Sequence, residues 1–196
     1  MPPKARITKE MITNAAFELV RADGADKLNV RNVSKRLGCS TQPVMYHYGT
    51  VEELKAAVCQ KADEYHTACL MDMRSEEPMM DIGLNFIRFA AQEKNLFALL
   101  FQSNNFSGKS IADLIDSDDV KPIIDLLSQM AEVDGVQAKA VFKTLAMFVY
   151  GYAGMLANND MKYEEKTIAA ELESVLYGAV AAAKMNNEKV INRKRR

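Results

Sequence analysis

The sequence has no tryptophan, only two histidines and only three cysteines. Cys39, Cys59 and Cys69 are odd in number and have no CxxC spacing, so they indicate neither a disulfide framework nor a thiolate metal site. His47 and His66 do not join Cys, Asp or Glu residues at the spacing of metal ligands. We therefore expect no metal and no cofactor, and the free thiols favour a reducing, cytoplasmic location.

The chain also has no apolar N-terminal segment of the secretory kind and no apolar run that approaches the roughly 18 residues needed to span a bilayer. Its most apolar segment, residues 142–157, begins shortly after Lys139, and we interpret it as a buried helix. We expect no membrane partner.

Motifs of catalysis are missing as well. No P-loop, nucleophile elbow or paired catalytic carboxylates stand out. The carboxylates of Asp116, Asp118 and Asp119 are typical of a solvated turn that caps a helix rather than of an acid–base pair. The sequence therefore does not predict an enzyme.

What is present is enough apolar material for a core, 48% of 196 residues. The apolar positions recur with helical spacing, and nothing reads as a strand bounded by hairpin turns, so we expect an all-α fold. The net charge of −1 hides an uneven distribution: +4 over residues 1–61, −10 over 62–183 and +5 over 184–196. The first third is basic and the body acidic.

Two helices are predicted at the start of the chain. Thr8 is placed to cap the first, which Gly24 ends. Asn29 is placed to cap a second, much shorter helix, which ends at Gly38, where a left-handed residue costs least in glycine.

A third short helix follows the Gly38 turn. Ser40 or Thr41 can cap it, Pro43 is tolerated in its first turn, and Gly49 breaks it. The sequence from Thr50 to Glu53 is a capping box that starts a fourth helix running to about Arg74. A short helix, a glycine turn and a second short helix are the elements of a helix-turn-helix.

The spacing predicts that Val44 and Tyr48 point into the core. The side chains left on the outer face of the third helix are Thr41, Gln42, Met45, Tyr46 and His47. Gln can read base edges, Thr and Met can touch a thymine methyl group, and Tyr and His can hydrogen-bond phosphate. The alternative is that these are surface residues of a small helical bundle, since helical pairs joined by glycine turns are common.

Residues 7–60 resemble the DNA-binding block of the TetR family of bacterial transcription regulators. The resemblance is carried by NVRNVSKRLGCSTQPVMYHYGTVEELKAAV, in which the direct matches to the family pattern are Gly38, Ser40, His47, Glu52, Glu53 and Leu54. Met45 stands where the family most often has a phosphate-contacting tyrosine, and Val51 stands where it often has a lysine. These departures affect single contacts rather than the whole block.

The resemblance implies a homodimer that binds palindromic operator DNA and responds to a small molecule. It implies a DNA-binding domain over residues 1–55, a linking fourth helix over about 51–74, an effector-binding and dimerisation domain over 75–186 and a basic tail over 187–196. The implied DNA contacts are Arg31, Ser40, Thr41, Gln42, Pro43, Met45, Tyr46, His47, Thr50 and Lys55.

The body of the chain is rich in aromatic residues and methionine, which suit either a closely packed core or an apolar pocket for a hydrophobic or aromatic effector. The candidate pocket residues are Phe86, Phe89, Phe97, Phe101, Phe106, Met130, Phe142, Met147, Phe148 and Tyr150. Helices over about 136–158 and 163–185 form either an intrachain bundle or, as the resemblance implies, a four-helix dimer interface. The candidate interface residues are Leu145, Tyr152, Ile168, Leu172, Val175, Leu176 and Ala179.

We therefore expect a ligand-responsive transcriptional regulator, with repression as the favoured sign. The alternatives are an activator or a thiol-responsive regulator of the same fold. If the basic first third binds no DNA, the alternative is a structural interaction protein. Cys59 and Cys69 cannot bridge each other within one helix, because ten residues separate them by about 15 Å.

Overall fold

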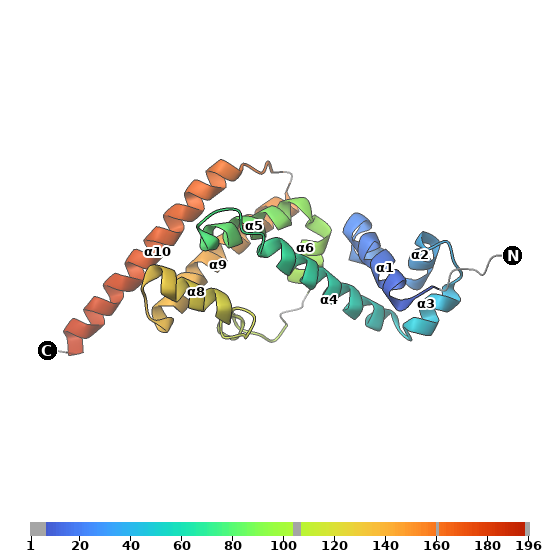
Figure 1. Cartoon of the computed structure of the whole chain (residues 1–196), viewed down its shortest axis with the longest axis horizontal. Coiled ribbons are helices and arrows are strands. Elements are labelled where there is room, and N and C mark those ends of the chain that lie inside the picture. Colours follow the sequence, from blue (N-terminus) through green and yellow to red (C-terminus); the bar gives the residue numbers. More distant parts are fainter. Residues whose placement is uncertain (1–6, 104–106, 160, 195–196) are drawn as a thin grey trace. The chain divides into compact units, whose positions relative to one another are not determined.

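The computed structural model describes residues 7–103, 107–159 and 161–194 (Figure 1). Within these ranges every regular element is a helix and there is no strand, which confirms the all-α prediction. The elements are α1 (Lys9–Asp23), η1 (Ala25–Lys27), α2 (Val30–Arg36), α3 (Thr41–His47), α4 (Val51–Leu70), α5 (Pro78–Gln92), α6 (Lys94–Phe101), α7 (Ile111–Ile115), α8 (Lys121–Ala131), α9 (Gly135–Asn158) and α10 (Glu165–Lys194).

The chain forms two compact units. The first unit comprises Met1–Cys69 and Gln92–Asn105, and the second comprises Leu70–Ala91 and Phe106–Arg196. The division differs from the predicted one, in which the first domain ended at residue 55. All but the last residue of α4 belongs to the first unit, and α6 joins it from far along the sequence.

The predicted caps of the first two helices are confirmed. The backbone N–H of Met11 donates to Thr8 Oγ1 at 3.2 Å, and that of Asn32 donates to Asn29 Oδ1 at 2.9 Å. α1 ends at Gly24 with φ +88°, a conformation that glycine adopts without steric cost.

The predicted capping box of α4 is also present, with a shift of one residue. The N–H of Glu53 donates to Thr50 Oγ1 at 3.1 Å, while the Glu53 carboxylate accepts from the N–H of Gly49 at 2.9 Å rather than from that of Thr50. The box therefore ties the end of α3 to the start of α4.

α4 ends at Leu70, earlier than the predicted Arg74, because buried side chains capture the backbone that follows. The Asp81 carboxylate accepts from the N–H groups of Arg74 and Ser75 at 2.8 and 2.7 Å. The Asn85 amide donates to the carbonyl oxygens of Leu70 and Asp72 at 3.2 and 2.9 Å. These bonds compete with another turn of helix, and Pro78 then starts α5.

In the second unit α9 packs against α8 and α10 (Figure 1). The most deeply buried side chains of this core include Ile87, Leu127, Val141, Leu156, Ile168 and Leu172. α5 comes close to α10 at Gly83, where an added Cβ would meet Leu172 Cδ2 at 2.6 Å. α10 continues to Lys194, so most of the predicted basic tail is helical.

α9 corrects a further expectation from the sequence. By length and composition alone it is apolar enough to cross a membrane, whereas no such segment was predicted. Only 28% of its most apolar 18-residue window is buried, whereas the sequence predicted that this segment is a buried helix. Its apolar residues thus lie on two faces, one packed in the second unit and one exposed.

Candidate nucleic-acid interface

The turn between α2 and α3 is closed by backbone hydrogen bonds. Gly38, at φ +64°, donates its N–H to the Lys35 carbonyl at 3.2 Å, and Cys39 donates to the Ser34 carbonyl at 3.0 Å. These bonds satisfy the carbonyl groups at the end of α2 and fix where α3 begins.

One side of α3 is anchored in the core of the first unit. Val44 is fully buried and Tyr48 is 4% exposed, as predicted. The Tyr48 hydroxyl shares a short hydrogen bond with Thr13 Oγ1 on α1. Because these anchors lie at i and i+4, the opposite side of the helix must face outward.

The outward side carries four of the predicted contacts. Met45 is 60% exposed and Tyr46 is 78% exposed, and Thr41 and Gln42 are exposed as well. α3 therefore has one buried side and one solvent-exposed side.

His47 is only half-exposed and is already engaged within the chain. Its Nε2 lies 3.1 Å from the carbonyl oxygen of Ile7, and its ring stands edge-on to Tyr46 with centroids 5.1 Å apart. His47 thus ties the end of α3 to the segment before α1, and its Nδ1 makes no hydrogen bond to any residue that the structure describes.

The remaining predicted contacts surround α3. Arg31 on α2 and Lys55 on α4 are exposed, and Pro43 is half-exposed. Ser40 is the N-cap residue of α3 but makes no side-chain capping bond, whereas Thr50 Oγ1 is occupied by the cap of α4.

Two exposed cations were missing from the predicted contacts. Lys35 and Arg36 lie in the last turn of α2. Their signal in the sequence is a basic pair placed just before a glycine turn. Exposed cations of this kind are suited to phosphate contacts.

The predicted pocket residues belong to both units. Phe97 and Phe101 fold into the first unit because α6 packs with α1, so they cannot line a pocket within the second. Met130, Met147 and Tyr150 are 40–47% exposed. Phe89 is 3% exposed, Phe86, Phe142 and Phe148 are half-buried, and Phe106 lies outside the described residues.

Two surface hollows are formed elsewhere. One, of about 370 Å³, lies on the first unit and is lined by residues of α1 and α4, including Lys9, Asn14, Gln60 and Lys61. The other, of about 430 Å³, lies between α9 and α10 and is lined by Ala140, Thr144, Val175, Gly178, Ala179, Ala182 and Ala183. Neither is lined by a predicted pocket residue.

Three of the predicted dimer contacts are buried in their own chain. Leu145, Ile168 and Leu172 are at most 6% exposed, because α9 and α10 pack against each other through them. Tyr152, Val175, Leu176 and Ala179 are half-buried.

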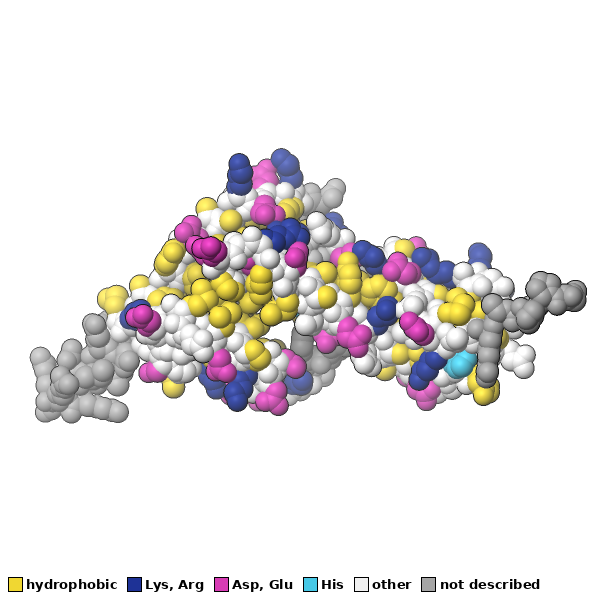
Figure 2. All heavy atoms as spheres, viewed as in Figure 1, with side chains coloured by type: hydrophobic (Ala, Val, Ile, Leu, Met, Phe, Trp, Pro, Cys, Tyr) yellow, Lys and Arg dark blue, Asp and Glu magenta, His cyan; other side chains and the backbone are white. Residues whose placement is uncertain are grey.

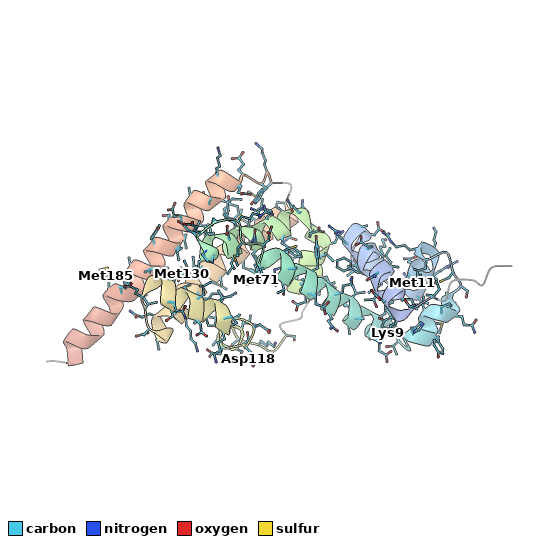
Figure 3. All side chains as sticks on the ribbon, viewed as in Figure 1. Lys9, Met11, Met71, Asp118, Met130 and Met185 are labelled. Atoms are coloured by element: carbon cyan, nitrogen blue, oxygen red, sulfur yellow. The ribbon has the colours of Figure 1, made fainter. Side chains whose placement is uncertain are left out.

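The exposed face of the same two helices is different. The exposed residues include Met147, Gly151 and Met155 on α9 and Tyr177, Gly178 and Ala182 on α10, and hydrophobic side chains gather over α9 in Figure 2. Met130 on α8 and Met185 on α10 are exposed as well (Figure 3).

A polar cluster links α5 to the start of α10 within the second unit. Arg88 donates to Asn85 Oδ1 and, at 2.9 Å, to Glu165 Oε2, which also accepts from the Tyr163 hydroxyl at 3.0 Å. The hydrogen bond from Arg88 lowers the pKa of the Glu165 carboxyl group. This cluster is internally satisfied and its role is structural.

The three carboxylates between α7 and α8 lie in a solvated turn, as predicted. Asp116, Asp118 and Asp119 are exposed between α7 and α8, and Asp118 is marked in Figure 3. Asp116 pairs with Lys139 of α9. In the ranges that the structure describes, no group of three or more His, Cys, Asp and Glu residues could hold a metal ion.

No protein-family model matches the chain, and a search of curated proteins gives no match.

Proposed function

We propose that the protein is a transcription regulator of the TetR type that binds double-stranded operator DNA through α3. The observation that carries the proposal is the two-sided character of this helix. Val44 and Tyr48 anchor it in the core, while Met45 and Tyr46 are 60% and 78% exposed. A helix held from behind and exposed in front is suited to insertion in a major groove.

The neighbouring elements supply phosphate contacts in this proposal. Arg31, Lys35 and Arg36 are exposed on α2, and Lys55 is exposed on α4. Each cation that contacts a phosphate releases counterions, so affinity should fall steeply with salt. Val51, at the first position of α4, offers its backbone N–H but no charge.

The proposal requires two copies of the chain, because a palindromic site needs two recognition helices related by a twofold axis. The exposed face of α9 and α10 is suited to this pairing. The exposed residues of these helices include the large apolar side chains of Met147, Met155 and Tyr177 and the small residues Gly151 and Gly178. Small residues allow two helices to approach closely, and the surrounding large apolar side chains would be buried.

The second unit is the proposed effector-binding part, and a small hydrophobic or aromatic molecule is the proposed ligand. The ligand must bind more tightly to the dimer arrangement that does not bind DNA, and a coupling of about 1–3 kcal/mol is typical. Repression that the ligand relieves is the favoured direction of regulation. A thiol-responsive mechanism is less favoured, because burial raises the pKa of the Cys59 thiol and so reduces its reactive thiolate fraction.

The DNA proposal is tested by fluorescence anisotropy with the DNA upstream of the protein's own gene, in the presence of unrelated competitor. Saturable binding is expected for the wild type and for Lys162→Ala, a control at an exposed position of the second unit. The double variant Gln42→Ala/Tyr46→Ala should lose this binding while keeping its oligomeric state. Binding by the wild type that the unrelated competitor abolishes at constant salt would contradict the proposal.

The dimer proposal is tested by sedimentation equilibrium. Met155→Glu with Tyr177→Glu places two charges on the proposed interface and should give monomers. Met71→Glu, at a residue 55% exposed in the segment between α4 and α5, is the matched control and should leave a dimer. A wild-type protein that remains monomeric at high concentration would refute this interface.

A further inference from the structure

The chemical composition of α3 decides which base edges its side chains can read. All seven of its residues, TQPVMYH, are described, and they include no Lys, Arg, Asp or Glu. The side chains that face outward are Thr41, Gln42, Met45 and Tyr46. They are neutral, and two of them present apolar methyl groups.

This composition restricts which base pairs α3 can read. Guanine is most often recognised by a bidentate Arg or Lys, and cytosine by a carboxylate that accepts from its amino group. α3 has neither kind of group. A guanine contact in this region would have to come from another element, such as Arg31 on α2.

The groups that are present fit adenine and thymine. The Gln42 amide can donate to N7 and accept from the N6 amino group of adenine with one planar side chain. Met45 follows three residues later, one turn along the same side of the helix, and is 60% exposed. Its thioether and methyl group suit contact with the 5-methyl group of thymine.

From these observations we infer that the half-site read by α3 is built on A·T pairs, with Gln42 on an adenine and Met45 on the 5-methyl group of a nearby thymine. The inference rests on the proposed DNA-binding function and deepens it by naming the bases. His47 assists indirectly, because its bond to the Ile7 carbonyl holds the end of α3 in place.

The experiment begins with selection of bound duplexes from a randomised pool, so that the protein itself picks out its preferred site. An enriched palindrome with A·T pairs at the centre of each half-site is expected. Each thymine of the enriched site is then replaced in turn by deoxyuridine, which removes only the 5-methyl group. Loss of about fourfold in affinity is expected at one thymine per half-site, corresponding to one buried methyl group.

Three variants assign the contacts. Met45→Ala should bind the thymine and deoxyuridine sites equally, whereas Met45→Leu, which keeps an apolar side chain, should retain the preference for thymine. Gln42→Ala should lose roughly tenfold in affinity and accept other bases at the adenine position. Circular dichroism would verify that each variant is folded.

The outcomes separate the two proposals. An enriched palindrome with G·C pairs at the centre of its half-sites, or a site that binds equally well with deoxyuridine throughout, would overturn the A·T inference while leaving the regulator intact. A pool from which no sequence is enriched would contradict the DNA-binding function itself, and the inference would fall with it.

Discussion

Arg21 and Glu93 form an ion pair that joins α1 to the start of α6. Arg21 Nε donates to Glu93 Oε2 at 2.8 Å, Nη2 donates to Oε1, and the Tyr65 hydroxyl donates to Oε1 at 3.2 Å. The Asn95 amide supports this junction by donating to the carbonyl oxygens of Arg21 and Ala22 at 3.0 and 3.2 Å. These contacts hold a segment from beyond α5 within the first unit.

Replacing Arg21 with Met should destabilise the first unit by about 2 kcal/mol. The Glu93 side chain is 12% exposed, so its charge would lose its cation in a poorly solvated place, while the 37% exposure of Arg21 keeps the loss below that of a fully buried pair. Urea unfolding of the purified protein measures the change. Lys162→Ala removes a pair whose side chains are 84% and 55% exposed and should change stability by less than about 0.5 kcal/mol.

His66 should make the protein sensitive to acid. It is 7% exposed against Phe101, and burial lowers the pKa of its imidazole to about 4, from the usual value of about 6.5. At a pH between these two pKa values, His66 binds a proton in the unfolded chain but not in the folded chain. Stability is therefore fully present above about pH 6.5 and is lost as the pH falls towards 4, by at most about 3 kcal/mol.

The measurement is the free energy of unfolding against pH for wild type and His66→Leu. The variant should lose less stability over the same range, and the difference between the two curves isolates His66 from the carboxylates. Parallel curves would show that His66 is protonated without cost in the folded protein.

Gly38→Ala should cost about 1 kcal/mol in stability. The residue has φ +64°, which L-residues adopt only at a steric cost. Apart from its two chain neighbours, no residue that the structure describes has an atom within 4 Å of an added Cβ, so the loss comes from the backbone conformation. Gly38→Asn should cost less, because asparagine tolerates this conformation. Equal losses in the two variants, measured by thermal unfolding, would contradict this explanation.

Gly83→Ala and Gly178→Ala should have opposite effects. At Gly83 the new methyl group would meet Leu172, which is 2% exposed and has little room to move, so a loss of about 1–2 kcal/mol is expected. At Gly178 an added Cβ would have no atom of the described residues within 4 Å apart from its own helix backbone and chain neighbours, so alanine should raise helix stability by about 0.5–1 kcal/mol. Both changes in stability are measured by denaturant unfolding at low protein concentration. If Gly178→Ala instead lowers stability, and the loss grows as the protein concentration is raised, a second copy of the chain packs against Gly178.

The sequence by itself determined the local structure of the first helices. The caps at Thr8 and Asn29, the glycine ends at Gly24 and Gly38 and the inward positions of Val44 and Tyr48 were all predicted and are confirmed. These features depend on residues within a turn or two of each other, where hydrogen-bonding groups and backbone preferences act directly.

Tertiary structure alone decided where α6 belongs and which apolar residues are buried. Nothing near Glu93 in sequence indicates that Arg21 will hold it, and this contact holds α6, with Phe97 and Phe101, within the first unit. Likewise, the apolar pattern of α9 and α10 could not tell the packed face, with Leu145 and Leu172, from the exposed face, with Met147 and Tyr177. Burial depends on which distant surfaces meet, because any neighbour that excludes water stabilises a buried apolar side chain.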